Sequence, residues 1–158
     1  MSGRPPVLVL AVGNPSRGDD ALGALLAERL EAAGLPHVEV IVEFQLQVEH
    51  ALDLEGRSLV IFVDAGMGTP APFQLRRVKP AADFVHTTHA LSPEALLATC
   101  ERVVGNVSAE TWVLCVRGES FELGEGLSAA AASNLDAAWA ALVARVEERP
   151  GRVQIRQP

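Results

Sequence analysis

Three polar residues of this 158-residue sequence have side chains that together can bind a metal ion: Asp20, Asp64 and His89. Two carboxylates and one imidazole suit a divalent transition metal and leave coordination positions open for a substrate. Each residue also has an ordinary structural interpretation. Asp20 can cap a helix, Asp64 can bond its own backbone in a turn, and His89 can be a solvated loop histidine. Residue type alone leaves both interpretations open.

The spacing of these residues relative to the strand patterns favours a shared site. Asp20 lies beyond the apolar run at residues 7–12. Asp64 closes the apolar run at 59–63, and His89 follows a further strand-like segment. In open α/β sheets, ligands bind outside the carboxyl ends of the strands, where loops that are distant in sequence meet. We therefore expect the three side chains to converge there.

Strand and helix patterns alternate along the chain, and the strongest strand patterns are apolar throughout. This alternation is typical of an α/β three-layer sandwich with a mostly parallel, or mixed, central sheet. We expect central strands at 7–12 and 59–63 and a long helix at 127–146. The length fits one domain, with a core at about 7–148 and a polar C-terminal tail at 149–158.

Several residues mark the expected ends of helices. A helix should open at Asp19-Asp20 and end at Gly34. Ser92 is a good N-cap for the next long helix pattern, with Pro93 at its first position. The segment 45–54 has the pattern of a short helix.

Composition excludes some classes of function. The formal net charge of −7 argues against nucleic-acid binding, which needs a basic surface. No apolar run approaches the roughly 20 residues that span a membrane, and the first residues lack a signal-peptide pattern. Cys100 and Cys115 are too few for a disulfide framework and are expected to be small buried hydrophobes. We expect a cytoplasmic monomer without a membrane partner.

Two other chemistries are disfavoured. Gly13 and Gly18 have the spacing of a phosphate-binding loop, but the sequence continues with Asp19-Asp20 instead of Lys and Ser or Thr. Two carboxylates would repel a phosphate at that helix start. An aspartic-protease dyad, made by Asp20 with Asp19 or with Asp64, would need the Asp-Thr/Ser-Gly sequence of that class, which is missing.

The segment 8–23, LVLAVGNPSRGDDALG, closely resembles the opening of the hydrogenase maturation endopeptidases. That family has a strand, then Gly-Asn, four variable positions, Asp-Asp/Glu, and Gly three residues later. Three weaker resemblances follow in the same order along the chain, at 62–65 (FVDA), 88–92 (THALS) and 121–128 (FELGEGLS). Together the matches extend over most of the chain, from about residue 7 to residue 146.

This resemblance implies an endopeptidase that removes the C-terminal extension of a [NiFe] hydrogenase large-subunit precursor after nickel insertion. It implies that Asp20, Asp64 and His89 are both the metal ligands and the catalytic residues. The substrate would supply the nickel, and other divalent metals can substitute in the isolated protein. The family often has Glu at the position of Asp20, so the shorter Asp20 side chain must come closer to the metal.

The resemblance leaves one departure, one alternative histidine and two rival functions. Many members have Gly-Thr-x-Gly after the second strand, whereas this chain has EFQLQVEH at 43–50, which resembles the subgroup that serves soluble bidirectional hydrogenases. His86 precedes His89 by three residues and would point to the opposite face of an extended segment. The rival functions are a non-catalytic metal-sensing chaperone of the large subunit and a generic α/β peptidase.

Overall fold

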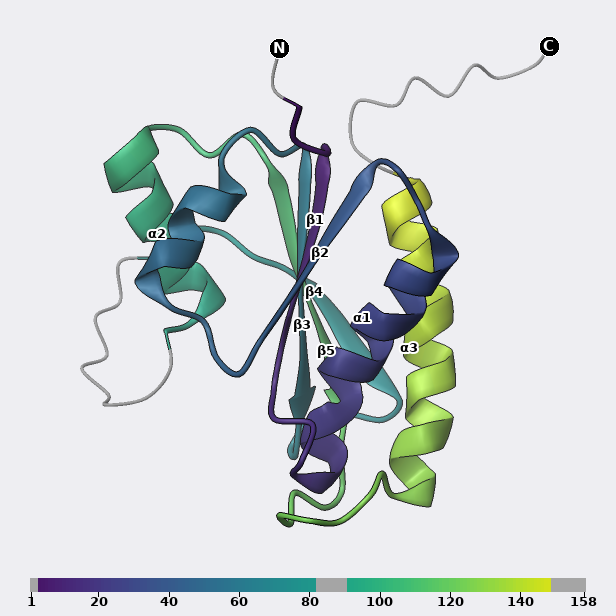
Figure 1. The fold of residues 1–158 in the computed structure, drawn as a ribbon. Helices are drawn as coiled ribbons and strands as arrows, with labels where there is room; N and C mark the ends of the chain where they lie inside the picture. The colour runs from purple at the N-terminus through teal and green to yellow at the C-terminus, as the bar shows by residue number, and fades with distance from the viewer. Residues whose placement is uncertain (1–2, 82–90, 149–158) are drawn as a thin grey trace, which may run out of the picture.

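A five-stranded sheet lies between helices in the computed structural model, which describes residues 3–81 and 91–148 (Figure 1). The strand order is β2-β1-β3-β5-β4. The strands are β1 (Val7–Val12), β2 (Val38–Glu43), β3 (Leu59–Gly66), β4 (Phe73–Arg77) and β5 (Glu110–Arg117). The first three pairs in that order are parallel, and β4 is antiparallel to β5. The predicted α/β sandwich with a mixed sheet is therefore confirmed.

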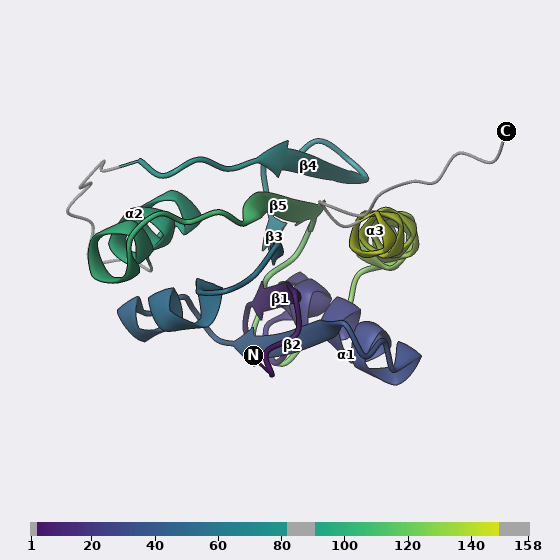
Figure 2. The same ribbon diagram turned by 90° about the horizontal axis from the view of Figure 1, so that it is seen from above.

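Helices cover both faces of the sheet (Figure 2). One face packs against α1 (Leu22–Ala33) and α3 (Ala129–Glu147), and the other packs against α2 (Pro93–Val104) and the 3-10 helix η2 (Val48–Leu54). Alternate residues of β1 enter the two cores, because successive strand side chains point to opposite faces. Both faces of β1 are thus buried, which explains why its sequence is apolar at every position.

Several predicted element ends agree with the structure. Gly34 ends α1 in the left-handed conformation, with φ of 64°. The Ser92 side chain accepts a hydrogen bond from the Ala95 amide at 3.1 Å, as an N-cap does. The long C-terminal helix is also present, although it begins at Ala129, with Ser128 as its N-cap. The central strands predicted at 7–12 and 59–63 are β1 and β3.

Other predictions needed correction. The turn that holds Asp19 and Asp20 is a 3-10 helix, η1 (Gly18–Ala21), and the α-helix begins only after it. The segment expected to form a short helix at 45–54 is the 3-10 helix η2, and it starts at Val48. No helix of the described residues is long and apolar enough to cross a membrane.

The third strand is longer than its apolar run predicts. β3 continues through Asp64 to Gly66, because the eight-residue strand β5 pairs with it along its whole length. On its other side, β1 pairs with β3 only as far as Val63. Asp64 therefore lies on β3 one residue beyond the pairing with β1, level with Val12, the last residue of β1. Asp64 thus lies at the carboxyl edge of the sheet, where β1 ends.

Candidate active site

A cavity of about 360 Å³ lies at this edge, on the face of the sheet that packs against η2 and α2. Asp20 and Asp64 both line it, although they lie 44 positions apart in the chain. The other described residues that line it come from every strand except β2, from the loop before η2 and from the start of α2: Val12, Gly13, Phe44, Gln45, Leu46, Phe62, Gln74, Arg76, Leu91, Pro93, Val113 and Cys115.

Asp64 is a half-buried carboxylate with a perturbed pKa. Its Oδ1 accepts a hydrogen bond from the Ala65 amide at 2.7 Å. Burial raises the pKa of Asp64 from 3.8 to about 6, the Ala65 hydrogen bond opposes this rise, and the charge of Asp20 adds to it. The repulsion between the two carboxylates shows that they share one electrostatic environment. A cation between them would relieve that repulsion, so the pair fits a metal ion.

The loop that precedes Asp20 fixes the orientation of its carboxylate. Asp20 Oδ2 accepts a hydrogen bond from the Asn14 amide at 2.8 Å. Gly13 has φ of 141°, and a Cβ there would collide with the backbone oxygen of Asp20. The helix-cap interpretation of Asp20 is wrong, because Ala21 is the N-cap of α1 and no side chain caps that helix. The loop instead folds against Asp20 and holds it towards the cavity.

His89 lies outside the described residues, so the third member of the predicted trio is not placed. Leu91, two positions after it in the sequence, lines the same cavity as the two carboxylates. Within residues 3–81 and 91–148, no group of three or more His, Cys, Asp or Glu side chains is arranged to hold a metal ion. We refer to the two carboxylates that the structure does place, Asp20 and Asp64, as the half-site; metal binding there stays a prediction.

Of the adjacent residues Asp19 and Asp20, Asp19 has the structural role, a difference that the sequence did not reveal. It is 0% exposed, and its carboxylate accepts hydrogen bonds from the amides of Glu119 and Ser120 and from the amide and hydroxyl of Ser128. Burial alone would raise the pKa of Asp19, but these hydrogen bonds outweigh it and hold the pKa below its usual value. With its carboxylate engaged in this way, Asp19 cannot share a proton with Asp20 in an aspartic dyad.

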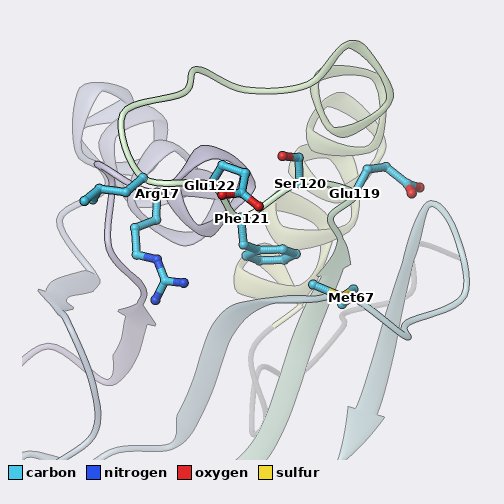
Figure 3. Close-up of a pocket in the computed structure, with 7 residues that line it drawn as sticks. Arg17, Met67, Glu119, Ser120, Phe121 and Glu122 are labelled. Carbon is cyan, nitrogen blue, oxygen red and sulfur yellow. The ribbon is translucent and has the colours of Figure 1, made fainter.

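Asp19 also supports a second, larger cavity of about 660 Å³ (Figure 3). Arg17, Met67 and residues 119–123 line this space, and the Phe121 ring lies between Arg17 and Met67. Backbone hydrogen bonds join η1 to the loop between β5 and α3, including one from Asp19 N to Ser120 O at 2.7 Å. Neither Asp20 nor Asp64 lines this space. Of these two cavities, the smaller one is therefore the one that the predicted site residues Asp20 and Asp64 line.

The smaller cavity contains polar groups that sequence reasoning missed. Cys100 is buried as predicted, with 2% exposure, but the same prediction is wrong for Cys115. Cys115 is only partly buried, and its Sγ lies 3.0 Å from Thr69 Oγ1. Gln74 and Arg76 reach the cavity from β4. The signal for these residues is strand register, which depends on pairing between distant segments and is not readable from local pattern.

Comparison with known proteins shows similarity at the level of structure. No family model and no curated protein matches the sequence. Hydrogenase maturating endopeptidase HybD from E. coli superposes with a TM-score of 0.70 at 24% identity, covering 90% of this chain and 92% of that chain. The [NiFe] hydrogenase maturation protease HycI from Thermococcus kodakarensis gives 0.68 at 21% identity, covering 90% and 93%.

A third solved structure agrees with these two. Hydrogenase 2 maturation peptidase from Thaumarchaeota archaeon SCGC_AB-539-E09 gives a TM-score of 0.65 at 24% identity, covering 89% of this chain and 97% of that chain. Each comparison covers nearly the whole of both chains, so the likeness includes the sheet and the helices on both of its faces. The chain therefore has the fold of the hydrogenase maturation endopeptidases.

Proposed function

We propose that this protein is an endopeptidase that removes the C-terminal extension of a [NiFe] hydrogenase large-subunit precursor after nickel has been inserted. One observation carries the proposal: Asp20 and Asp64, from separate segments of a fold shared with such proteases, line one cavity and repel each other electrostatically. The proposal includes His89 as the third ligand and catalytic residue. It also places the protein in the cytoplasm as a monomer.

The half-site suits a metal that arrives with the substrate. Two carboxylates and one imidazole would bind an isolated ion weakly and would add ligands to a nickel ion that the precursor already holds. When bound, the ion can polarise the scissile carbonyl or activate water. Recognition of the metal would then restrict cleavage to precursors that have received it. Other divalent metals can occupy the same ligands in the isolated protein.

The chain's own contribution is preorganisation. The Asn14 amide holds the Asp20 carboxylate, and the Ala65 amide holds that of Asp64, so neither side chain has to be reoriented when a cation enters. The cavity of about 360 Å³ that both carboxylates line gives room for the substrate chain beside Asp64. Fixed ligands of this kind reduce the cost of forming a productive complex.

The proposal is tested by incubating the protein with nickel-loaded and nickel-free precursor and measuring the mass of the precursor. We expect shortening of the nickel-loaded precursor only. An unshortened precursor that nevertheless binds the protein would indicate a metal-sensing chaperone. Cleavage of short unstructured peptides without nickel would indicate a generic peptidase. Either result would overturn the proposal.

A further inference from the structure

The smaller cavity has two charged ends. Asp20 and Asp64 supply the negative charges, and Arg76 is the only cation among the described residues that line it. A metal ion would satisfy the carboxylates, whereas the Arg76 guanidinium, which also pairs with Glu94, lines the same cavity. Arginine donates hydrogen bonds through a planar fork and remains charged at all relevant pH values. The natural partner for such a group is an oxygen atom that carries negative charge.

Strand register places Arg76 on the same face of the sheet as Asp64. Asp64, Cys115 and Gln74 are aligned across β3, β5 and β4. Arg76 lies two residues further along β4, so its side chain has the same direction as that of Gln74. Two strand spacings and two residue steps separate the Cα atoms of Asp64 and Arg76 by about 12 Å. Both side chains line the same cavity, so a substrate peptide bound in it would lie within reach of both.

Two further observations support this placement. Arg76 Nη1 lies 3.1 Å from Glu94 Oε2, so the guanidinium is tethered to the first turn of α2, whose residue Pro93 also lines the cavity. Cys115 lies on β5, between the strands of Asp64 and Arg76, and the charges of both side chains affect the pKa of its thiol. Burial raises the pKa of Cys115, Asp64 adds to the rise, and Arg76 opposes it.

We propose that Arg76 is a catalytic residue that binds the carbonyl oxygen of the scissile peptide bond. This inference rests on the proposed function. In the hydrolysis, a water oxygen bonds to the carbonyl carbon and the C=O electron pair moves onto the carbonyl oxygen. The pair returns as the C–N bond breaks, and a proton from water leaves on the amine. Arg76 stabilises the charge that the oxygen carries between these events.

The neighbouring residue Arg77 offers a matched control. It lies on the same strand, but its side chain points to the opposite face, where it lies 3.6 Å from Glu110 and 5.7 Å from the Trp112 ring centroid. The side chains are similarly exposed, 43% for Arg76 and 49% for Arg77, and each has one carboxylate partner. Replacing either arginine removes one exposed ion pair, which has little effect on stability.

The test measures precursor binding and single-turnover cleavage separately, for wild type, Arg76→Met, Arg76→Lys and Arg77→Met. Loss of an oxyanion donor lowers catalytic rates by roughly 100-fold or more. We expect Arg76→Met to cleave nickel-loaded precursor about 100-fold more slowly than Arg77→Met while binding it within about threefold of wild type. Arg76→Lys should recover part of the rate, because it keeps the charge. Arg76→Gln replaces the methionine variant if that variant does not fold.

The outcomes separate this inference from the proposed function. If wild type does not cleave nickel-loaded precursor, the proposed function fails and the role of Arg76 fails with it. If wild type cleaves and Arg76→Met is as fast as Arg77→Met, only the role of Arg76 is overturned. A variant that loses binding instead of rate would likewise show that Arg76 does not act on the scissile carbonyl.

Discussion

Replacing Asp64 with asparagine should stabilise the metal-free protein at neutral pH. Asparagine keeps the size of the side chain, and its Oδ1 can still accept the hydrogen bond from the Ala65 amide. It removes a charge that the half-buried site disfavours, since burial is the main cause of the raised pKa of Asp64. The variant therefore isolates the cost of holding an ionised carboxylate in the cavity without a metal.

The size of this effect follows from the pKa. A shift from 3.8 to about 6 corresponds to roughly 3 kcal/mol, which is an upper value for the cost of ionised Asp64 in the folded state. Between pH 4 and pH 6, approximately, the folded state holds the Asp64 proton and the unfolded chain does not. The free energy of unfolding of wild type must therefore fall as pH rises through this window. Above the window, the difference from Asp64→Asn is constant.

Urea denaturation in the presence of a chelator measures this difference across the pH range. We expect equal stabilities near pH 4 and a variant more stable by about 1–3 kcal/mol at pH 7.5. The lowered pKa of Asp19 affects both proteins equally and cancels in the difference. A stability difference that does not change with pH, or a less stable variant at pH 7.5, would refute the conclusion that burial disfavours the ionised form of Asp64.

Three further predictions concern the surroundings of the site. Asp19→Asn should lower the free energy of unfolding by about 3 kcal/mol or more, measured by urea denaturation, because an amide cannot accept all the hydrogen bonds that this buried carboxylate accepts. Gly13→Ala should cost about 2 kcal/mol or more in thermal or urea unfolding, because the added Cβ collides with the Asp20 backbone. His86→Ala should leave precursor cleavage near the wild-type rate; a folded but inactive variant would show that the wrong histidine had been chosen.

Local pattern was sufficient to predict the layers of this fold. The all-apolar runs of β1 and β3 identified strands buried on both faces, and Gly34 and Ser92 marked helix ends through their own backbone and capping chemistry. These signals depend on residues within one turn or one strand, so they are present in the sequence itself. Because such signals do not include contacts between distant segments, the expected ends of elements were correct only to within a few residues.

The inner arrangement of the site could not be predicted in the same way. Adjacent Asp19 and Asp20 have the same chemistry, and only the fold shows that one is buried against the loop before α3 and the other lines the cavity. The placement of Cys115 and Arg76 depends on the pairing of β5 with β3 and β4, segments that are far apart in the chain. The role of His89 stays a prediction, because it lies outside the described residues.

The measurement that tests the central claim most directly is the mass of nickel-loaded precursor after incubation with wild type, Asp20→Asn and Asp64→Asn. Asp136→Asn is the control, because it removes an exposed carboxylate paired with Arg29, away from the cavity. We predict a shortened precursor with wild type and the control, and a full-length precursor with both site variants, which should remain folded. Shortening at near wild-type rate by Asp20→Asn and Asp64→Asn would contradict the account.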